Sequence, residues 1–302
     1  MNQKELSSKV VSLRAKRLQN VSITDNGTQK NQRPNTRVIA ITSGKGGVGK
    51  TNIVANLGFA LSKMGKKVLI LDADLGLGNL DILLGVAPKY NLSHVINGVK
   101  SIPEVTIDGP GNLKILPASS GIQELTHLTK EQRARILREL DRLVDHIDIL
   151  LIDTAAGISS NVIYFNTAAQ EIMVVVSPDP SSMTDAYALM KVLSLRYSER
   201  QFKILINLAR TMTEAEEVFR QLKLVSDRFL NISMEYIGHI SFDENVTKSV
   251  RRQRLVSELY PESEGGKCFD ALAKKICQSP PDFCSKGKGS FFWKYIPENM
   301  FE

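Results

Sequence analysis

The chain has few of the features that mark secreted, disulfide-bonded or membrane-spanning proteins. Its 302 residues include three cysteines, which lie near the C-terminus and form no Cys-x-x-Cys pair. We therefore expect reduced thiols, with neither a disulfide framework nor a local zinc site. No apolar run approaches the roughly 18–20 residues that a transmembrane helix needs. The N-terminal residues are polar and basic without an apolar segment, so we expect no secretory signal and a cytoplasmic protein.

Acidic side chains are scarce only at the N-terminal end. Residues 1–37 hold eight basic and two acidic groups, whereas the remaining residues hold 31 and 30. A nearly neutral body disfavours a core built to grip nucleic acid, and the basic character belongs to an N-terminal arm. We expect a basic amphipathic helix over residues 1–19 and a flexible linker, rich in Asn, Gln, Thr and Ser, over residues 20–36.

The nine residues from Ser43 to Thr51 read Ser-Gly-Lys-Gly-Gly-Val-Gly-Lys-Thr. An apolar run typical of a buried strand precedes them, and a helical pattern follows. Glycines let backbone N–H groups converge on phosphate oxygens, and the helix start adds its positive dipole end. Lys50 is expected to neutralise the β- and γ-phosphates, and the Thr51 hydroxyl to bind Mg²⁺. The predicted nucleotide-binding residues here are Gly44, Lys45, Gly46, Gly47, Val48, Gly49, Lys50, Thr51 and Asn52.

Two further predicted strands end in carboxylates. Asp72 and Asp74 follow one run of Leu and Ile, and Asp153 follows another. Burying unpaired carboxylates is costly, and Mg²⁺ with an attacking water gives a reason for them. We expect Asp72 and Asp153 to join Thr51 in binding Mg²⁺, and Asp74 to orient or deprotonate the water that attacks the γ-phosphate. An acidic loop that caps the next helix is the alternative for Asp72 and Asp74.

Lys45 precedes the glycines, where an ordinary phosphate loop has no charge. With it, residues 45–51 fit the pattern Lys-Gly-Gly-x-Gly-Lys-Thr, and the chain resembles the deviant Walker A ATPases of the MinD/ParA family over residues 37 to about 277. The resemblance implies ATP and Mg²⁺ as ligands, slow hydrolysis regulated by a partner, and a homodimer in which Lys45 reaches the partner's nucleotide. It assigns catalysis to Lys45, Lys50 and Asp74. A solvated loop lysine is the alternative for Lys45.

The same resemblance implies two switch segments. Residues 72–81 fit the family's switch I pattern, Asp-x-Asp-x-Gly-x-x-Asn-x-Asp, which contains Gly76 and Asn79. Asp153 begins switch II, where Gly157 is expected to act as a hinge that responds to the γ-phosphate.

Recognition of the base is less visible in the sequence. The family holds adenine with an Asn that follows a strand, and Asn207 has that place here. The loop 240–243 aligns with the family's second base-contacting segment, which implies contacts from Phe242 and Asp243. A turn Asn at a strand end and an Asp that caps a helix are the alternatives.

From residue 37 onward, apolar runs alternate with helical patterns. Continuous Val, Ile and Leu runs are typical of strands that are covered on both faces. We predict an α/β fold with a doubly wound, mostly parallel sheet of about seven or eight strands in a single domain over residues 37–279, followed by a tail over 280–302. The resemblance implies a P-loop NTPase of the SIMIBI type. Strands are expected at 38–42, 67–72, 113–116, 148–152, 171–176, 202–206 and 235–239, and helices at 50–64, 129–145, 159–169, 182–196 and 213–229.

Two of the expected helices carry capping boxes. Thr129 with Gln132 and Thr213 with Glu216 fit the pattern in which an N-cap hydroxyl and an amide or acid three residues later bond reciprocally. These motifs predict the residues at which the two helices begin.

Within the family, several stretches are similar to the flagellar number regulators of the FleN/FlhG type. They are residues 71–81, 116–121, 152–157, 184–189, 250–254 and 258–261. This implies a protein that restrains flagellar genes through a master transcription regulator and engages the GTPase that places the flagellum. The main alternative is a partition- or division-site ATPase that positions cargo on DNA or membrane. A family of iron–sulfur carriers on the same fold uses a C-terminal Cys-x-x-Cys, which this sequence lacks.

Three segments leave partner contacts open. Residues 8–14 match only Leu13 and Arg14 of the family's GTPase-stimulating motif, so a basic helix that contacts membrane or nucleic acid is an equal alternative. The aromatic run 291–296 suits an anionic lipid interface, which predicts reversible association with the inner face of the cytoplasmic membrane; a tail packed on the domain is the alternative. A basic cluster, Lys248, Arg251, Arg252 and Arg254, is expected on one helix, where the neutral body favours solvent or a partner protein over DNA.

Overall fold

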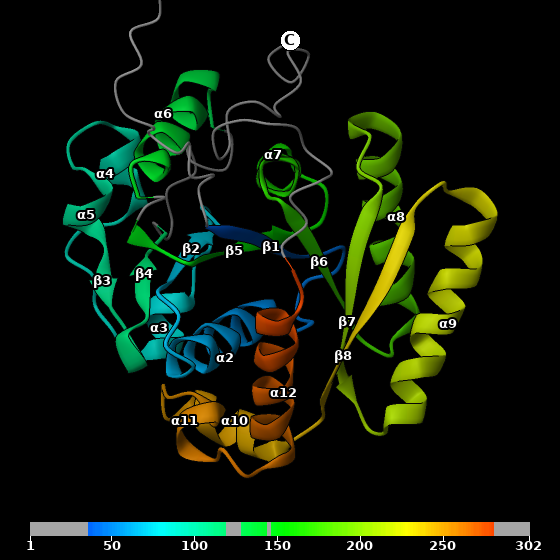
Figure 1. Cartoon of the computed structure of the whole chain (residues 1–302). Helices are drawn as coiled ribbons and strands as arrows, with labels where there is room; N and C mark the ends of the chain where they lie inside the picture. The colour runs from blue at the N-terminus through cyan, green and yellow to red at the C-terminus, as the bar shows by residue number, and fades with distance from the viewer. Residues whose placement is uncertain (1–35, 119–127, 144–145, 281–302) are drawn as a thin grey trace, which may run out of the picture. The chain divides into compact units, whose positions relative to one another are not determined.

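The computed structural model describes residues 36–118, 128–143 and 146–280. Within them, eight strands form one sheet in the order β3-β4-β2-β5-β1-β6-β7-β8 (Figure 1). Every neighbouring pair is parallel except β3 with β4, which confirms the predicted doubly wound sheet. The strands are β1 (Arg37–Ser43), β2 (Val68–Ala73), β3 (Ile107–Asp108), β4 (Lys114–Leu116), β5 (Ile149–Ala156), β6 (Glu171–Val176), β7 (Gln201–Ala209) and β8 (Ser233–Ser241).

Helices cover both faces of this sheet (Figure 1). Among the described residues, no helix combines the length and apolarity that crossing a membrane requires. The helices are α2 (Lys50–Lys63), α3 (Leu80–Leu84), α4 (Leu92–Ile96), α5 (Ile102–Val105), α6 (Lys130–Asp141), α7 (Ser160–Ala168), α8 (Pro180–Tyr197), α9 (Met212–Phe229), α10 (Glu244–Arg251), α11 (Val256–Leu259) and α12 (Glu264–Gln278).

The two faces follow from the two-residue period of the strands. In β1, Ile39 and Ile41 point into a core shared with α2 and α12, whereas Val38 and Ala40 point into the core shared with α4, α6 and α7. All four side chains are fully buried, as the continuous apolar run predicted. Burial on both faces explains why the strand sequences show no polar alternation.

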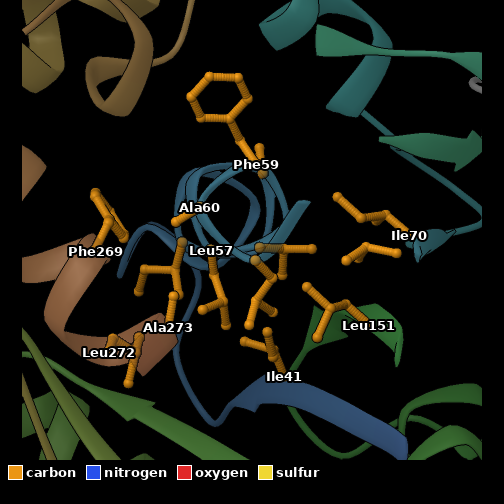
Figure 2. Packing of buried hydrophobic residues seen from close by; sticks show 14 of the residues in the cluster. Ile41, Leu57, Phe59, Ala60, Ile70, Leu151, Phe269, Leu272 and Ala273 are labelled. Atoms are coloured by element: carbon orange, nitrogen blue, oxygen red, sulfur yellow. The ribbon is translucent and has the colours of Figure 1, made fainter. Parts of the chain in front are cut away.

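Helix α2 lies at the centre of one of these cores (Figure 2). Its Leu57 and Ala60 are packed between strand residues such as Ile41 and the α12 residues Phe269 and Leu272. Each fully buried side chain of this size contributes about 1.5–3 kcal/mol relative to an exposed one. The helix that begins at the glycine-rich loop is therefore held firmly on two sides, which fixes where its first turn points.

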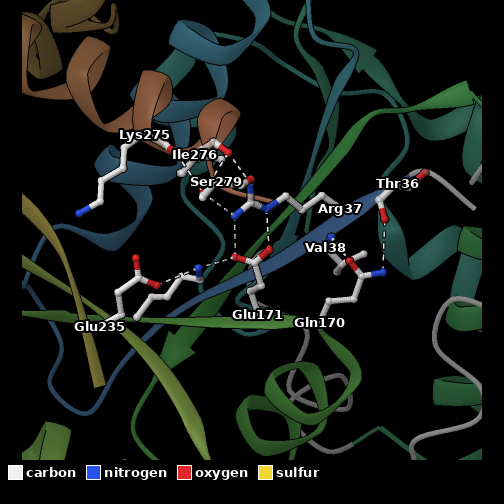
Figure 3. A network of polar contacts seen from close by, with 10 residues as sticks. Thr36, Arg37, Val38, Gln170, Glu171, Glu235, Lys275, Ile276 and Ser279 are labelled. Atoms are coloured by element: carbon white, nitrogen blue, oxygen red, sulfur yellow. Dashed lines mark hydrogen bonds and ion pairs between the residues drawn. The ribbon is translucent and has the colours of Figure 1, made fainter. Parts of the chain in front are cut away.

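A network of buried charges joins the start of the first strand to the end of the last helix (Figure 3). The guanidinium of Arg37 donates two hydrogen bonds to Glu171 at 2.5 and 2.8 Å, and others to the carbonyl oxygens of Ile276 and Ser279 at the end of α12. Lys203 lies 3.3 Å from the same carboxylate. Arg37 was counted with the basic arm in the charge balance, but it is buried in the domain.

The structure corrects several of the element boundaries that the sequence predicted. Thr36, expected in the linker, is fully buried and donates to the Ile147 carbonyl at 2.7 Å. Thr213 lies inside α9, and the capping residue is Thr211, whose hydroxyl accepts from the Glu214 N–H. Thr211 and Glu214 form this arrangement two residues earlier, with the Glu214 carboxylate accepting from the Arg210 N–H.

The other capping box, Thr129 with Gln132, is confirmed at the start of α6, which ends at Asp141 and not at residue 145. The sequence patterns did not predict β3, α3, α4, α5, α11 or α12. The proposed arm, the linker before Thr36 and nearly all of the tail lie outside the described residues.

Candidate nucleotide site

The predicted catalytic groups meet at the carboxyl ends of three adjacent strands. β2, β5 and β1 are neighbours in the sheet, and Asp153 of β5 is in register with Asp72 of β2 and Ile41 of β1. The glycine-rich loop follows β1 directly. Ligands of open α/β sheets bind at this edge, so the topology brings together residues that lie far apart in the sequence.

The loop enters α2 through a left-handed glycine. Gly49, the N-cap of α2, has φ +89°, and Gly47 has φ +78°, a conformation that favours glycine. No side chain caps α2, and its first turn carries no acidic residue. The first N–H groups of this helix therefore have no side-chain acceptor, and together with the helix dipole they form a site for an anion.

Gly44 is required by close packing. A Cβ atom there would lie 2.1 Å from the backbone carbonyl of Asp185 in α8. No side chain fits, so the loop rests directly on α8. This contact fixes the position of the loop against α8.

Lys50 is buried in the loop, with 9% of its surface exposed. Its Nζ donates to the Ser43 hydroxyl at 2.8 Å, and that hydroxyl donates to the Lys45 carbonyl at 2.6 Å. Burial lowers the pKa of Lys50, and the carboxylates of Asp153 and Asp74 oppose that change. Because Ser43 is a neutral acceptor, the ammonium lies in a place where an added anion would be strongly favoured.

Asp153 is the most unusual carboxylate of the site. It is 1% exposed, and its Oδ1 atom has no hydrogen-bond partner among the described residues. Burial raises its pKa to about 7, although a hydrogen bond with the Thr51 hydroxyl and the charge of Lys50 act in the opposite direction. A buried, unsatisfied carboxylate oxygen beside a hydroxyl is a suitable pair of ligands for a hard cation.

Asp72 lies beside Asp153 but uses its oxygens within its own loop. Oδ1 accepts from the Asp74 N–H at 3.1 Å, and Oδ2 accepts from the Leu80 N–H at 3.4 Å. Burial and the nearby Asp153 raise the pKa of Asp72 well above its usual range. The structure thus shows Asp72 shaping the loop after β2, and the metal contact expected of it stays a prediction.

The remaining switch residues lie around this loop. Asp74 accepts from the Leu77 N–H at 3.3 Å, and its charge acts on both Lys50 and Asp153. Gly76 is half-buried, and Asn79 is exposed at the N-cap of α3 without a side-chain bond. Gly157 has φ +90° and donates its N–H to the Ser43 carbonyl at 2.9 Å. Switch II is therefore hydrogen-bonded to the start of the phosphate loop.

Lys45 is held within its own chain. Its Nζ donates to Asp179, the N-cap of α8, and to the Ser181 hydroxyl at 2.5 Å. The hydrogen bond from Lys45 lowers the pKa of Asp179 to about 2. Both side chains are over a third exposed, so this ion pair opens at little cost. In this single chain Lys45 is therefore paired and not simply solvated, which was the alternative.

The expected base-contacting residues lie on the other side of the loop. Asn207 is inside β7, and its Nδ2 donates to the Val48 carbonyl at 2.7 Å, so it braces the loop and is no turn residue. Phe242 is 59% exposed. Asp243 caps α10, accepting from the Asn245 N–H at 2.8 Å and the Gly265 N–H at 2.9 Å. That matches the capping alternative; contacts of all three with adenine stay predictions.

Sequence reasoning missed three supporting residues. They are Ser43, which accepts from Lys50; Asp179, which pairs with Lys45; and Gly78, where a Cβ would lie 2.8 Å from Asp72 Oδ2. Ser43 and Gly78 stand inside the quoted motifs, so their position was available as a signal. Asp179 is 134 residues from Lys45, and only the fold brings them together.

The site fits Mg²⁺ bound together with a phosphate ligand. No group of three or more His, Cys, Asp or Glu side chains in the described part of the chain could hold a metal alone. Mg²⁺ commonly takes one or two protein oxygens, with waters and phosphate oxygens completing its shell. Asp153 and Thr51 supply that number, and the unsatisfied Oδ1 of Asp153 is free to take part.

Comparison with known proteins agrees with this site. A family model described as an AAA domain matches residues 36–206. The chain is 44% identical over 256 residues to the antiactivator FleN of Pseudomonas aeruginosa, covering 85% of this chain and 91% of FleN. It is 30% identical over 267 residues to the flagellum site-determining protein YlxH of Helicobacter pylori, covering 87% and 90%.

A solved structure has the same fold. The septum site-determining protein MinD of Pyrococcus horikoshii, in complex with Mg-ADP, matches with a TM-score of 0.67 at 26% identity, covering 80% of this chain and 96% of that one. The family model spans more than half of the chain, and the flagellar relatives match it over most of their length. The chain belongs to the MinD/ParA family of P-loop ATPases, as an ATPase of the FleN/FlhG or division-site kind.

Proposed function

We propose that this chain is an ATP-hydrolysing switch that dimerises on ATP and regulates the number and placement of flagella and the expression of flagellar genes. The observation that most supports ATPase activity concerns the buried Oδ1 of Asp153. This atom has no hydrogen-bond partner among the described residues and lies near the desolvated Lys50. Leaving such groups unpaired costs stability, and a site for Mg-ATP accounts for the cost.

Each group has a role in this proposal. Lys50 and the first N–H groups of α2 bind the phosphates, and Thr51 and Asp153 hold Mg²⁺. Bound Mg²⁺ neutralises charge that develops on the phosphate oxygens. Asp74 orients the attacking water, and its position in a loop shaped by Asp72 lets the whole segment respond to the γ-phosphate. Hydrolysis is slow until a partner completes the site.

Dimerisation is proposed to begin with the opening of the Lys45–Asp179 pair. In the single chain, Lys45 is paired in cis. A second copy that brings its own nucleotide offers Lys45 a more highly charged acceptor than one carboxylate, so the lysine exchanges partners across the interface. The ATP dimer is then the signalling state, and the ADP-bound or empty monomer is the resting state.

The flagellar role rests on the relatives. FleN is named an antiactivator and YlxH a flagellum site-determining protein. By analogy we assign two partners to the ATP dimer: a flagellar master transcription regulator and the GTPase that places the flagellum. We also propose a cytoplasmic protein that associates reversibly with the anionic inner face of the membrane. Dimerisation joins two membrane-contacting chains in one complex and so raises avidity.

The direct test is phosphate release from Mg-ATP. The wild type is expected to turn over, and Asp74→Ala to lose about 100-fold or more of the rate while still binding ATP, because the variant lacks only the water-orienting carboxylate. Asp227→Ala, on the distant helix α9, is the matched control and should turn over normally. Normal turnover by Asp74→Ala would remove the assignment of Asp74.

The flagellar role is tested separately in the native host. Replacing the chromosomal copy with a Lys45→Ala version should change the number of flagella per cell, counted by electron microscopy. If the counts stay at the wild-type value while ATP-dependent dimerisation is lost in the purified variant, the dimer does not control flagella. Salt-sensitive, ATP-dependent binding to random duplex DNA would then favour the partition-type alternative.

A further inference from the structure

The segment that runs from the end of α10 into α11 is hydrogen-bonded to α3 and to α2. We call residues 250–257 the α10–α11 turn. The Gln253 Nε2 donates to the Ile82 carbonyl of α3 at 3.0 Å, just after the switch I loop. The Ser257 N–H donates at 3.0 Å to Asn56 Oδ1 of α2, the helix that begins at Lys50. The turn is therefore joined to the phosphate-binding helix and to the switch.

The contact with α3 is close and conformationally demanding. Gln253 has φ +53°, a left-handed conformation that is unfavourable for a residue with a side chain. A Cβ added at Gly85, which ends α3, would lie 3.3 Å from the Cβ of Gln253. The expected single helix through residue 254 does not form, because α10 ends at Arg251 and Gln253 reverses the chain. A displacement of α3 would therefore also displace Gln253 in the turn.

The turn carries two arginines without a carboxylate. Arg251 is exposed and has no ion-pair or hydrogen-bond partner among the described residues, and Arg252 donates only to the Tyr260 hydroxyl at 3.1 Å. The other basic residues of the cluster are paired: Lys248 with Glu244, and Arg254 with Glu258. The positive charge of this surface is thus concentrated on Arg251 and Arg252.

A pocket begins one residue beyond these arginines, at Gln253. It has a volume of ≈ 220 Å³ and lies between the end of α3 and the α10–α11 turn. Ile82 and Val250, on the two joined segments, are 58% and 39% exposed. Arginine next to exposed apolar groups and a pocket is the composition typical of protein interfaces. The pocket is lined by Leu84, Val86, Gly109, Pro110, Gln253 and Leu255 and by three charged residues, Asp108, Arg254 and Glu258. Their charges are paired within the chain, Asp108 with Lys114 and Arg254 with Glu258.

We propose that this face binds an acidic segment of a partner protein, with one apolar side chain in the pocket and carboxylates on Arg251 and Arg252, and that the nucleotide state sets its affinity through the Gln253–Ile82 contact. Two unpaired charges are few for non-specific DNA binding, where roughly six to ten phosphate contacts are usual. A flat lipid surface does not fill a pocket. An acidic peptide with an apolar anchor fits both features.

The nucleotide dependence rests on the proposed ATP site. Contacts with a γ-phosphate order switch segments, and α3 directly follows switch I. The Gln253 amide then transmits a shift of Ile82 to the arginines. Capture of peptides by the arginines depends only on charge and shape, so loss of ATP binding and loss of peptide binding are separate observations.

The test is a random 12-residue peptide library displayed on phage, selected on the full chain with Mg²⁺ and the non-hydrolysable analogue AMP-PNP. We expect enrichment of peptides that carry Asp or Glu around a Leu, Ile or Phe. For a selected peptide, Arg251→Glu with Arg252→Glu should weaken binding about tenfold or more, since two charge-assisted contacts are lost. The matched reversal on α9, Arg220→Glu with Lys223→Glu, should change it less than about twofold.

Two further measurements decide the coupling and guard against misfolding. Wild-type affinity for the peptide should differ at least about threefold between Mg-AMP-PNP and Mg-ADP, and Gln253→Ala should remove that difference. The arginine double variant and Gln253→Ala should both bind AMP-PNP as the wild type does, which shows that they fold. Equal enrichment on the arginine double variant, or equal affinity in both nucleotide states, overturns the proposal. Arginine-dependent binding of 20-base-pair random DNA or of phosphatidylglycerol vesicles without any enriched peptide also overturns it.

Discussion

The two ends of the sheet both bury charge, and they treat it in opposite ways. At the amino ends of β1 and β6, Arg37 and Glu171 form a two-point ion pair, and Lys203 and the last carbonyls of α12 satisfy the rest (Figure 3). At the carboxyl ends of β2, β5 and β1, the hydrogen-bond acceptor of Lys50 is a neutral hydroxyl, and Oδ1 of Asp153 has no hydrogen-bond partner within the described residues.

This difference separates structural from functional charges. A buried ion pair that is complete within the chain needs no ligand, and breaking it costs folding energy. A buried group without a partner costs energy until something binds it. The same contrast exists between the starts of the described helices of eight or more residues: α6, α7, α8, α9, α10 and α12 have side-chain caps, whereas α2 has none. At this edge of the sheet the uncapped start of α2 and the unsatisfied oxygen of Asp153 therefore occur together, as expected of a ligand site.

The largest expected effect is on stability, at the amino ends of β1 and β6, where the buried charges have partners within the chain. Glu171→Gln leaves Arg37 and Lys203 buried without their carboxylate and should lower the free energy of unfolding by about 3–5 kcal/mol, measured by urea denaturation. The matched control is Glu235→Gln, which removes a 52% exposed partner of the same Lys203 and should cost less than about 1 kcal/mol. If the two variants lose equal free energy of unfolding, the buried Glu171 contributes no more to stability than the exposed Glu235 does.

The second effect is on how stability depends on pH, through Asp153 at the nucleotide site. The pKa of Asp153 is raised from 3.8 to about 7, so the folded chain holds a proton that the unfolded chain has lost between these values. The free energy of unfolding should therefore fall as pH rises from about 4 to about 7, by up to about 4 kcal/mol from this group. Asp153→Asn should flatten the curve. Mg-ATP should oppose the fall by binding the ionised form.

The third effect distinguishes binding from folding. Lys50→Met keeps the volume but removes the ammonium, and should weaken binding of a fluorescent ATP analogue about 100-fold, roughly 3 kcal/mol. Burial lowers the pKa of Lys50, so the folded chain disfavours its charge, and the urea midpoint should stay the same or rise. A fall in the midpoint as large as that of Glu171→Gln would show that Lys50 serves mainly to hold the fold.

The sequence predicted the sheet and the phosphate loop because both depend on local patterns. Continuous apolar runs mark β1, β2 and β5, and carboxylates and glycines follow them at fixed spacing. The positions of Lys50, Thr51 and Asp153 at one edge then follow from the parallel topology. Three neighbouring strands each supply a group, so the prediction did not rest on any one of them.

Other features depend on contacts between residues far apart in the chain. Arg37 was placed at the edge of a basic arm, since nothing near it shows that Glu171 lies 134 positions later. Gln253 interrupts an apparent basic helix because its side chain packs on α3, 171 positions earlier. Asp179, the partner of Lys45, was missed for the same reason. Short helices such as α3, α4 and α5 contain too few residues for a periodic pattern.

The most direct test of the central claim is the mass of the purified chain in solution, by light scattering in saturating Mg-ATP with hydrolysis blocked by Asp74→Ala. The account predicts twice 33.5 kDa with ATP, 33.5 kDa with ADP, and 33.5 kDa with ATP when Lys45→Ala is added. A mass of 33.5 kDa in every sample, while ATP is shown to be bound, would contradict it.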